Sequence, residues 1–459
     1  MNALSGPGRG WPRWRPAGVT LGPAGVGLLA VVALAAALRL AWVLYAKTEP
    51  VWFFDPWNYD RLAASLAAGH GYVNEAGQPT AYYPPGYPAV LGVVYWLAGH
   101  RPMAGEALNV ALGAFTAGLV YWIGSRAFGR PAGLLAGLAF AVFPSHILYV
   151  SQLHSEVVFT AAYLLALGLM LASPPPGDQH WVPFWLATGL VLGVAALIRP
   201  AALSLLAVIP FALRPRGTPW WALARGTLLV LVAAAVVVTP WVIRNAVRVG
   251  TPTIATNAGI DFWIGNHEGA STLFVMPPPD VFPIISTDLQ EQERHDDRRG
   301  FELGWRFIRE QPLDALSLLP LKAYHLYTDD AHSVTTAETW GQTVFLSEGG
   351  RRVLRTLTDG FYYFVAAGAV AGLVLPVGGA QRRRWPLAAA LAGWTLVHLA
   401  FFGEPRFHLP VTPVMAVLAA PFWLWVADLL RRPIVARWRA LRPPAASEGD
   451  RGGLPTLTP

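Results

Sequence analysis

Apolar runs of about 20 residues recur along this chain and constrain its fold more than any other feature. A run of that length is what an α-helix needs to cross a hydrocarbon core of roughly 30 Å, where the backbone must satisfy its own hydrogen bonds. The composition agrees, because 54% of the residues are hydrophobic and only 13% are charged. The sequence therefore predicts an all-α, polytopic membrane protein.

We predict about ten transmembrane helices from these runs. They cover residues 19–45, 104–125, 131–150, 156–172, 183–198, 200–213, 220–242, 361–378, 386–402 and 408–430. Positively charged loops stay in the cytoplasm, so the arginine run 382–384 places its loop inside. Both termini are then cytoplasmic, and the net charge of +7 reflects orientation in the cell (inner) membrane rather than binding to nucleic acid. Residues 19–45 are too long for a signal peptide and form a retained first span.

The apolar stretch 85–98 is too short to cross, because about 14 residues give roughly 21 Å of helix. We interpret it as a juxtamembrane helix in the first outer loop. The predicted organisation is a cytoplasmic N-terminus (1–18), an N-terminal transmembrane module (19–243) with its first outer loop (46–103), an extracytoplasmic domain (244–356), C-terminal transmembrane helices (357–432) and a disordered cytoplasmic tail (433–459).

Two local predictions concern charged and amphipathic segments. Residues 299–327 of the small outer-face domain are predicted to form two amphipathic helices, broken at Pro312. Arg39 lies near the far end of the first span, where it is expected to extend toward the headgroups rather than face the bundle interior.

The stretch 52–61 follows the first span and holds two acids, two tryptophans and a tyrosine. Asp55 before Pro56 marks a helix start, and it would share a face with Tyr59, four residues later. An acid among aromatic rings at a membrane boundary is poorly hydrated, which raises its pKa and makes it a better proton acceptor. A nearby phosphate-bound arginine would pull that pKa back down. The alternative is an ordinary capping aspartate.

Other polar residues are predicted to reach the same outer depth. They are Asp60, Tyr82, Tyr83, Tyr87, His154, Ser155, Glu156, Arg199, Trp241, Arg244, Asn245, Glu404, Arg406 and His408. Each has a structural alternative: Ser155 and Glu156 could cap a helix, and Arg199 and Arg244 could reach into headgroups. Arg406 could pair with Glu404. Their joint placement nevertheless favours a functional site.

Location determines which chemistry this site can perform. Nucleotide-activated sugars are cytosolic, so an activated group at the outer face would arrive on a lipid phosphate. Arginines would hold the phosphate, and an acid would deprotonate the acceptor. A single phosphate needs little charge neutralisation, so arginines could replace a metal, and we expect no cofactor without excluding a divalent ion. The chain has no cysteine, and no nucleotide-binding glycine pattern or zinc-ligand spacing is found in the sequence.

Several motifs, taken in order, resemble those of the GT-C glycosyltransferases. The likeness is greatest to bacterial relatives of the dolichyl-phosphate-mannose-protein O-mannosyltransferases and of the lipid A aminoarabinose transferase. The matching residues are Asp55…Tyr59, Pro84-Pro85-Gly86-Tyr87-Pro88, Ser155-Glu156, Gly193…Arg199-Pro200, Pro240-Trp241…Arg244-Asn245…Gly250 and Arg406-Phe407-His408-Leu409-Pro410…Pro413. The resemblance implies a GT-C fold with two juxtamembrane helices in the first loop. It also implies a polyprenyl-phosphate sugar donor and Asp55 as the catalytic base.

The chain departs from that family pattern at two places. Many relatives carry a second acid directly after the catalytic aspartate, where this chain has Pro56, and Asp60 is the expected substitute. The aminoarabinose transferases have basic residues near the equivalents of Asn58 and Tyr83, which this chain lacks. Phosphate binding is therefore expected to shift to the later arginines.

These inferences predict an inverting, metal-independent hexosyl- or pentosyltransferase with a polyprenyl-phosphate donor and a protein, lipid or polysaccharide acceptor. Asp55 is the predicted base. The predicted substrate-binding residues are Tyr59, Asp60, Tyr83, Tyr87, His154, Glu156, Arg199, Arg244, Asn245 and Arg406. One alternative is an oligosaccharide ligase or polymerase with a diphosphate-linked donor. The other is a lipid or sugar transporter (flippase), which would favour mid-membrane charges and related halves.

Overall fold

The computed structural model describes residues 23–49, 55–213, 219–339, 344–376 and 383–440. The predicted N-terminal segment 1–18, the aromatic residues 52–54 and the tail after residue 440 lie outside these ranges. The described residues form helices and loops, with one isolated β-bridge between Val73 and Pro79. The prediction of an all-α fold is confirmed.

Seven of the described helices are long and apolar enough to span a membrane. They are α1 (Pro23–Ala46), α4 (Pro102–Phe128), α7 (Ser155–Ala172), α8 (Trp181–Ile198), α10 (Trp220–Arg248), α15 (Glu348–Val374) and α17 (Thr412–Ala440), the last continuing from η5 (Pro405–Val411). An eighth is possible if α5 (Arg130–Ala141) is joined to α6 (Pro144–Leu148) and η1 (Tyr149–Ser151), which are bent from it by 56°. The chain is a multi-pass membrane protein.

Among the described residues, fewer helices meet this length and composition than the roughly ten spans predicted. The run 200–213 is broken into η2 (Pro200–Val208) and the five-residue α9 (Ile209–Leu213). The run 386–402 forms α16 (Arg384–Ala400), whose 17 residues are at the lower end of the range of about 17–25 for a crossing helix. Hydropathy alone does not reveal where the backbone changes from α to 3-10 geometry.

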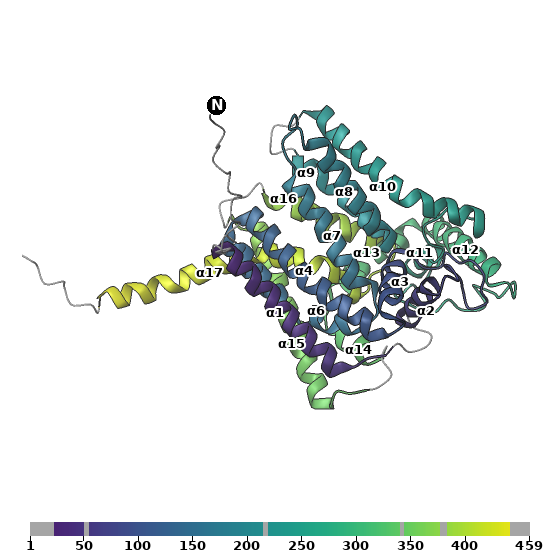
Figure 1. Ribbon diagram of the computed structural model, residues 1–459, viewed down its shortest axis with the longest axis horizontal. Helices are drawn as coiled ribbons and strands as arrows, with labels where there is room; N and C mark the ends of the chain where they lie inside the picture. The colour runs from purple at the N-terminus through teal and green to yellow at the C-terminus, as the bar shows by residue number, and fades with distance from the viewer. Residues whose placement is uncertain (1–22, 50–54, 214–218, 340–343, 377–382, 441–459) are drawn as a thin grey trace, which may run out of the picture.

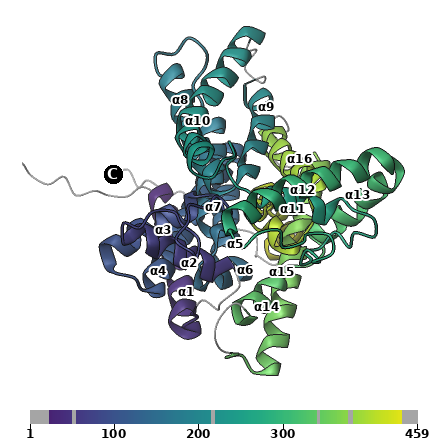
Figure 2. The ribbon, with the colours of Figure 1, turned by 90° about the vertical axis from the view of Figure 1, so that its right-hand side faces the viewer.

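Helices α2 (Asp55–Ala67), α3 (Gly86–Ala98), α11 (Ala258–Gly265) and α12 (Leu289–Glu310) gather at one end of the molecule. This end lies on the right in Figure 1 and faces the viewer in Figure 2. Helix α3 has 13 residues, which agrees with the prediction that it is too short to cross. The predicted break at Pro312 is confirmed, because α13 (Pro312–Tyr327) starts there, with only Gln311 between it and the end of α12.

The prediction that Arg39 extends toward the headgroups was wrong. Its side chain is fully buried inside the bundle. Its guanidinium donates to the carbonyls of Phe140 and Ala141 at 3.3 and 3.1 Å and to that of Ala35 at 3.2 Å. Helix α5 ends at Ala141, so the arginine satisfies carbonyls that have no intrahelical partner and lies at the negative end of a helix dipole.

The first loop is fastened to the segment that follows α10. The buried Glu293 carboxylate on α12 accepts from Thr80 Oγ1 at 2.7 Å and from the Ala81 backbone N–H at 2.8 Å. Thr256 Oγ1 also donates to it. Helices α11 and α12 touch backbone to backbone, since a Cβ added at Gly259 would lie 1.8 Å from the Asp297 carbonyl oxygen. The end of the molecule that carries the first loop is therefore one packed unit.

Candidate functional site

Asp55 stands at the first position of α2 and receives two side-chain hydrogen bonds. Tyr83 Oη donates to Oδ1 at 2.9 Å, and Arg406 Nη1 donates to Oδ2 at 3.0 Å. His154 Nε2 lies 4.0 Å from Oδ2. The Asp55 side chain is 26% exposed, so the carboxylate is accessible as well as held. These partners come from three distant parts of the chain.

The electrostatic environment of Asp55 contains both predicted influences on its pKa. Burial raises its pKa, but the charges of Arg406 and His154 and the hydrogen bonds from Arg406 and Tyr83 outweigh burial and hold the pKa below its usual value. The predicted rise from burial and the predicted opposing effect of an arginine are both present, and the arginine's effect prevails here. Aromatic neighbours in the sequence do not reveal that an arginine reaches the carboxylate.

Glu156 is fully buried at the start of α7 and does not cap the helix. Arg199 Nη2 donates to Oε1 at 2.5 Å, and His154 Nδ1 donates to Oε2 at 2.6 Å. Arg199 Nε also donates to Ser155 Oγ at 2.9 Å. A buried carboxylate of this kind needs its partners, because an uncompensated charge in a dry interior is strongly unfavourable. The capping alternative for Glu156 and the headgroup alternative for Arg199 are both wrong.

Arg406 bridges two carboxylates from η5. Its Nε donates to Glu404 Oε2 at 3.0 Å while its Nη1 donates to Asp55 Oδ2. The alternative of a pair with Glu404 is thus correct but incomplete. The Arg406 side chain is 12% exposed, and its guanidinium lies over the Phe407 ring. A planar fork that joins two carboxylates is a geometry that lysine cannot reproduce.

Tyrosines form the wall beside Asp55. The ring of Tyr59 lies 5.0 Å from that of Tyr83, 5.1 Å from that of Tyr87 and 6.1 Å from that of His154, measured between centroids. Burial, with the nearby Asp55 charge, raises the pKa of Tyr59, which keeps its hydroxyl protonated. The predicted residues Tyr59, Tyr83 and Tyr87 are therefore brought together with the acid.

Three predicted site residues have other partners. Asp60 accepts from Tyr95 Oη at 2.5 Å, and its second oxygen lies 2.9 Å from His100 Nε2. Arg244 donates to the carbonyls of Thr80 and Tyr72 at 2.6 and 2.7 Å and to Asn245 Oδ1 at 2.9 Å. Asn245 Nδ2 in turn donates to the Thr253 carbonyl at 2.7 Å. These hydrogen bonds indicate that Arg244 holds the first loop in place and that Asn245 holds the segment that follows α10.

Two residues near Asp55 were missed by the sequence analysis. Burial raises the pKa of Asp261 to about 7, against the charge of Arg406, and Asp55 and Glu404 add to the rise. His332, on α14 (His332–Thr339), has its pKa lowered by burial, and Glu404, Arg406 and His154 all influence it. A lone acid inside the apolar segment AGIDFWIG was a usable signal for Asp261. His332 had no comparable signal.

Within the part of the chain that the structure describes, no group of three or more histidine, cysteine, aspartate or glutamate side chains is placed to hold a metal ion. The carboxylates of Asp55, Glu156 and Glu404 each face an arginine instead. Arginine forks bind carboxylate and phosphate in the same way. The arrangement can therefore hold an anionic group and, from Asp55, accept a proton.

A sequence model of the family described as dolichyl-phosphate-mannose-protein mannosyltransferase matches residues 83–243. This range includes Tyr83, His154, Glu156 and Arg199, whereas Asp55 lies before it. Among curated proteins, none matches this chain in sequence.

Solved structures with a similar fold include an archaeal oligosaccharyltransferase, AglB from Archaeoglobus fulgidus, in complex with an inhibitory peptide and a dolichol-phosphate. The two chains are 18% identical with a TM-score of 0.52, over 93% of this chain and 52% of AglB. The A. fulgidus oligosaccharyltransferase in complex with Zn and sulfate matches at 16% identity and a TM-score of 0.52, over 90% and 51% of the two chains. ArnT from Cupriavidus metallidurans bound to undecaprenyl phosphate is 17% identical with a TM-score of 0.43, over 89% and 78%.

This chain spans about half the length of the oligosaccharyltransferase structures it matches. At these identities the likeness shows the fold, and the predicted GT-C fold is confirmed. The resemblance drawn from the sequence motifs is likewise confirmed, by the family match over residues 83–243 together with this fold.

Proposed function

We propose that this GT-C-fold membrane protein is a glycosyltransferase that takes a sugar from a polyprenyl-phosphate donor and transfers it to an acceptor at the outer face of the membrane. One observation carries the proposal. The carboxylate of Asp55 is partly exposed and is joined by a single guanidinium, that of Arg406, to a second carboxylate. A proton acceptor is thus placed directly beside a group that binds phosphate.

Donor binding changes the partners of Arg406. The phosphate diester that links the polyprenol to the sugar carries one negative charge and offers the guanidinium the same fork that the carboxylates use. When Arg406 turns to the phosphate, Asp55 loses the hydrogen bond that now holds its pKa down. Burial then dominates, and the carboxylate becomes a stronger base only after the donor is in place.

The transfer step follows from that geometry. Asp55 takes the proton from the acceptor hydroxyl as its oxygen attacks the anomeric carbon. The bond between that carbon and the phosphate oxygen breaks, and the polyprenyl phosphate leaves with the electron pair, its charge neutralised by Arg406. Attack from the side opposite the leaving group inverts the anomeric configuration. No metal ion is required by this scheme, in which a fixed cation stabilises the leaving group.

The remaining residues position these groups. Tyr83 holds Asp55 through Oδ1, and His154 faces the other oxygen. Glu156 orients His154, and Arg199 neutralises Glu156 from the end of α8. Holding the base at the correct distance from the acceptor hydroxyl itself increases the transfer rate, because a misplaced reacting atom lowers that rate.

The test is a reconstituted transfer assay. Purified protein in liposomes receives radiolabelled undecaprenyl-phosphate sugars (mannose, glucose, galactose and arabinose), with membrane and envelope extract as the source of protein, lipid and polysaccharide acceptors. We expect one donor to be consumed by the wild type and left intact by the Asp55→Asn variant. If the wild type binds and consumes none of them, the proposed function is overturned.

A further inference from the structure

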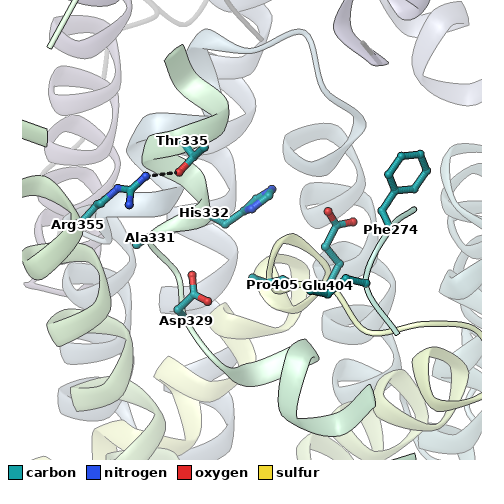
Figure 3. Close-up of a pocket in the computed structure, with 9 residues that line it drawn as sticks. Phe274, Asp329, Ala331, His332, Thr335, Arg355, Glu404 and Pro405 are labelled. Carbon is teal, nitrogen blue, oxygen red and sulfur yellow. Dashed lines mark hydrogen bonds between the residues drawn. The ribbon is translucent and has the colours of Figure 1, made fainter. Parts of the chain in front are cut away.

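A pocket with a volume of about 360 Å³ is lined by Glu404 and Pro405, and Asp55 is not part of its lining. Leu273 and Phe274 line one side of the pocket, and residues of α14 and α15 line the other. Figure 3 shows His332 and Glu404 directed into the same space, with Phe274 beyond Glu404. The volume is at the lower end of the range for small-molecule sites, about 300–1,000 Å³.

The pocket is joined to Asp55 through one side chain. Glu404, in the pocket wall, accepts from Arg406 Nε at 3.0 Å, and Arg406 Nη1 donates to Asp55 Oδ2 at 3.0 Å. The two carboxylates therefore lie on two edges of one guanidinium. A ligand that contacts Glu404 in this pocket is therefore connected to Asp55 through Arg406 alone.

The charge of the lining argues against an anion. Asp329 and Glu404 contribute carboxyl groups, Arg355 contributes one guanidinium, and burial lowers the pKa of His332 so that the ring is neutral at pH 7. Arg355 Nη2 already donates to Thr335 Oγ1 at 2.8 Å. The lining thus offers several hydrogen-bond donors and acceptors but no excess of positive charge. Such a lining fits hydroxyl groups better than phosphate.

We propose that this pocket binds a sugar ring of the glycosyl transfer, with Glu404, His332, Thr335 and Arg355 hydrogen-bonding to its hydroxyls and Phe274 covering an apolar face. The inference rests on the proposed function and names the ligand chemistry beside its catalytic group. The ring belongs either to the donor or to a saccharide acceptor. Both sources would present ring hydroxyls to this lining. Glu404 then has two tasks, to orient Arg406 and to hold the sugar.

The experiment uses full-length protein in nanodiscs and alters the wall that is remote from Asp55. The test variants are Thr335→Val and Arg355→Met. The control is Arg352→Met, which removes an exposed arginine from the same helix, α15, three residues earlier and outside the pocket lining. The probes are bare undecaprenyl phosphate and the undecaprenyl-phosphate sugar that the wild type binds most tightly among mannose, glucose, galactose and arabinose. Methyl glycosides serve as soluble acceptors.

If the pocket holds the donor's ring, both test variants bind the sugar-bearing lipid about fivefold more weakly, the effect of one lost hydrogen bond, and bind bare undecaprenyl phosphate like the wild type. If it holds an acceptor's ring, binding of both lipids is unchanged and the KM for the glycoside acceptor rises about fivefold. The control variant should match the wild type in every measurement.

Two results overturn the inference while leaving the proposed function standing. In one, the test variants transfer sugar and bind both lipids like the wild type. In the other, they lose affinity equally for bare and sugar-bearing lipid, which would make the pocket a phosphate site. A wild type that binds neither lipid instead overturns the proposed function, and this inference with it.

Discussion

The arginines of this bundle fall into two groups that differ in what they hold. Arg199 and Arg406 donate to the side-chain carboxylates of Glu156, Asp55 and Glu404. Arg39 and Arg244 instead donate mainly to backbone carbonyls, those of Phe140, Ala141, Thr80 and Tyr72 among them. An anionic partner can be exchanged for a phosphate, whereas a backbone carbonyl remains part of the fold. The comparison therefore separates arginines suited to a substrate from arginines that hold the chain together.

The largest effect is expected at Asp55, one of the carboxylates that Arg406 holds. Asp55→Asn keeps the shape but cannot accept a proton, so we expect turnover to fall at least about a hundredfold. Donor binding should persist or tighten, because Arg406 no longer faces a competing carboxylate. Transfer rate and lipid affinity, measured on the same preparation, check this. Near-normal transfer by this variant, with loss of transfer in Glu156→Gln, would assign the base to Glu156.

Arg406→Lys is expected to have the next largest effect. Lysine keeps the charge but loses the planar fork, so donor affinity should fall about tenfold, or about 1.4 kcal/mol. Arg432→Lys is the matched control, since Arg432 lies on the exposed part of α17 and pairs with Asp428. The measurement is lipid binding in nanodiscs. Unchanged affinity would place the phosphate site elsewhere, with Arg199 next to be tested.

Arg244→Lys should directly distinguish the arginines that hold backbone carbonyls from those that hold carboxylates. The substitution removes the paired bonds to the carbonyls of Thr80 and Tyr72, so we expect the free energy of unfolding to drop by about 1 kcal/mol. Donor affinity should stay at the wild-type value. Thermal unfolding in detergent and lipid binding are the two measurements. A loss of donor affinity with unchanged thermal stability would put Arg244 among the substrate-binding arginines, as the sequence predicted.

Asp60→Asn provides a milder contrast to Asp55→Asn. Asp60 is five residues further along α2, and its partners are Tyr95 and His100. We expect less than about a threefold change in turnover, since the residue touches neither Asp55 nor Arg406 through any described hydrogen bond. A hundredfold loss in steady-state transfer would restore Asp60 to the site.

The smallest effect concerns pH and Asp261. Its folded-state pKa is raised to about 7, above its unfolded value, so its stabilising contribution is present at low pH and is lost as pH rises through 7. Asp261→Asn, which stays neutral, should therefore melt at a higher temperature than the wild type by about 2 °C at pH 8, and the difference should shrink toward pH 4. Thermal unfolding between pH 4 and 8 checks this. A difference that grows toward pH 4 would contradict it.

Much of the site could be placed from the sequence, because each element begins or ends at a residue that marks it. Asp55 stands at a helix start, Glu156 at the first turn of α7 and Arg199 directly after α8, and all three were predicted to converge. The short α3 and the break at Pro312 followed from length and from proline chemistry in the same way.

The partners of these residues could not be predicted. Whether Arg39 turns inward depends on carbonyls released where α5 ends at Ala141, and whether Arg244 binds a substrate depends on where Thr80 and Tyr72 come to lie. These contacts join segments 102 to 172 residues apart, and no local pattern encodes them. Which arginine lowers the pKa of Asp55 could not be predicted for the same reason.

The separation between Asp55 and Arg406 has a consequence for how the protein is made. Their ion pair joins residues 351 positions apart. At a synthesis rate of about 5–20 residues per second, the acid leaves the ribosome roughly 20–70 s before the arginine that completes it. During that interval the nascent chain carries Asp55 without the guanidinium of Arg406, and a chain truncated before η5 never acquires it. If the proposed function holds, we expect chains that end before η5 not to consume the lipid carrier, so that such incomplete products do not drain a shared pool of activated sugar.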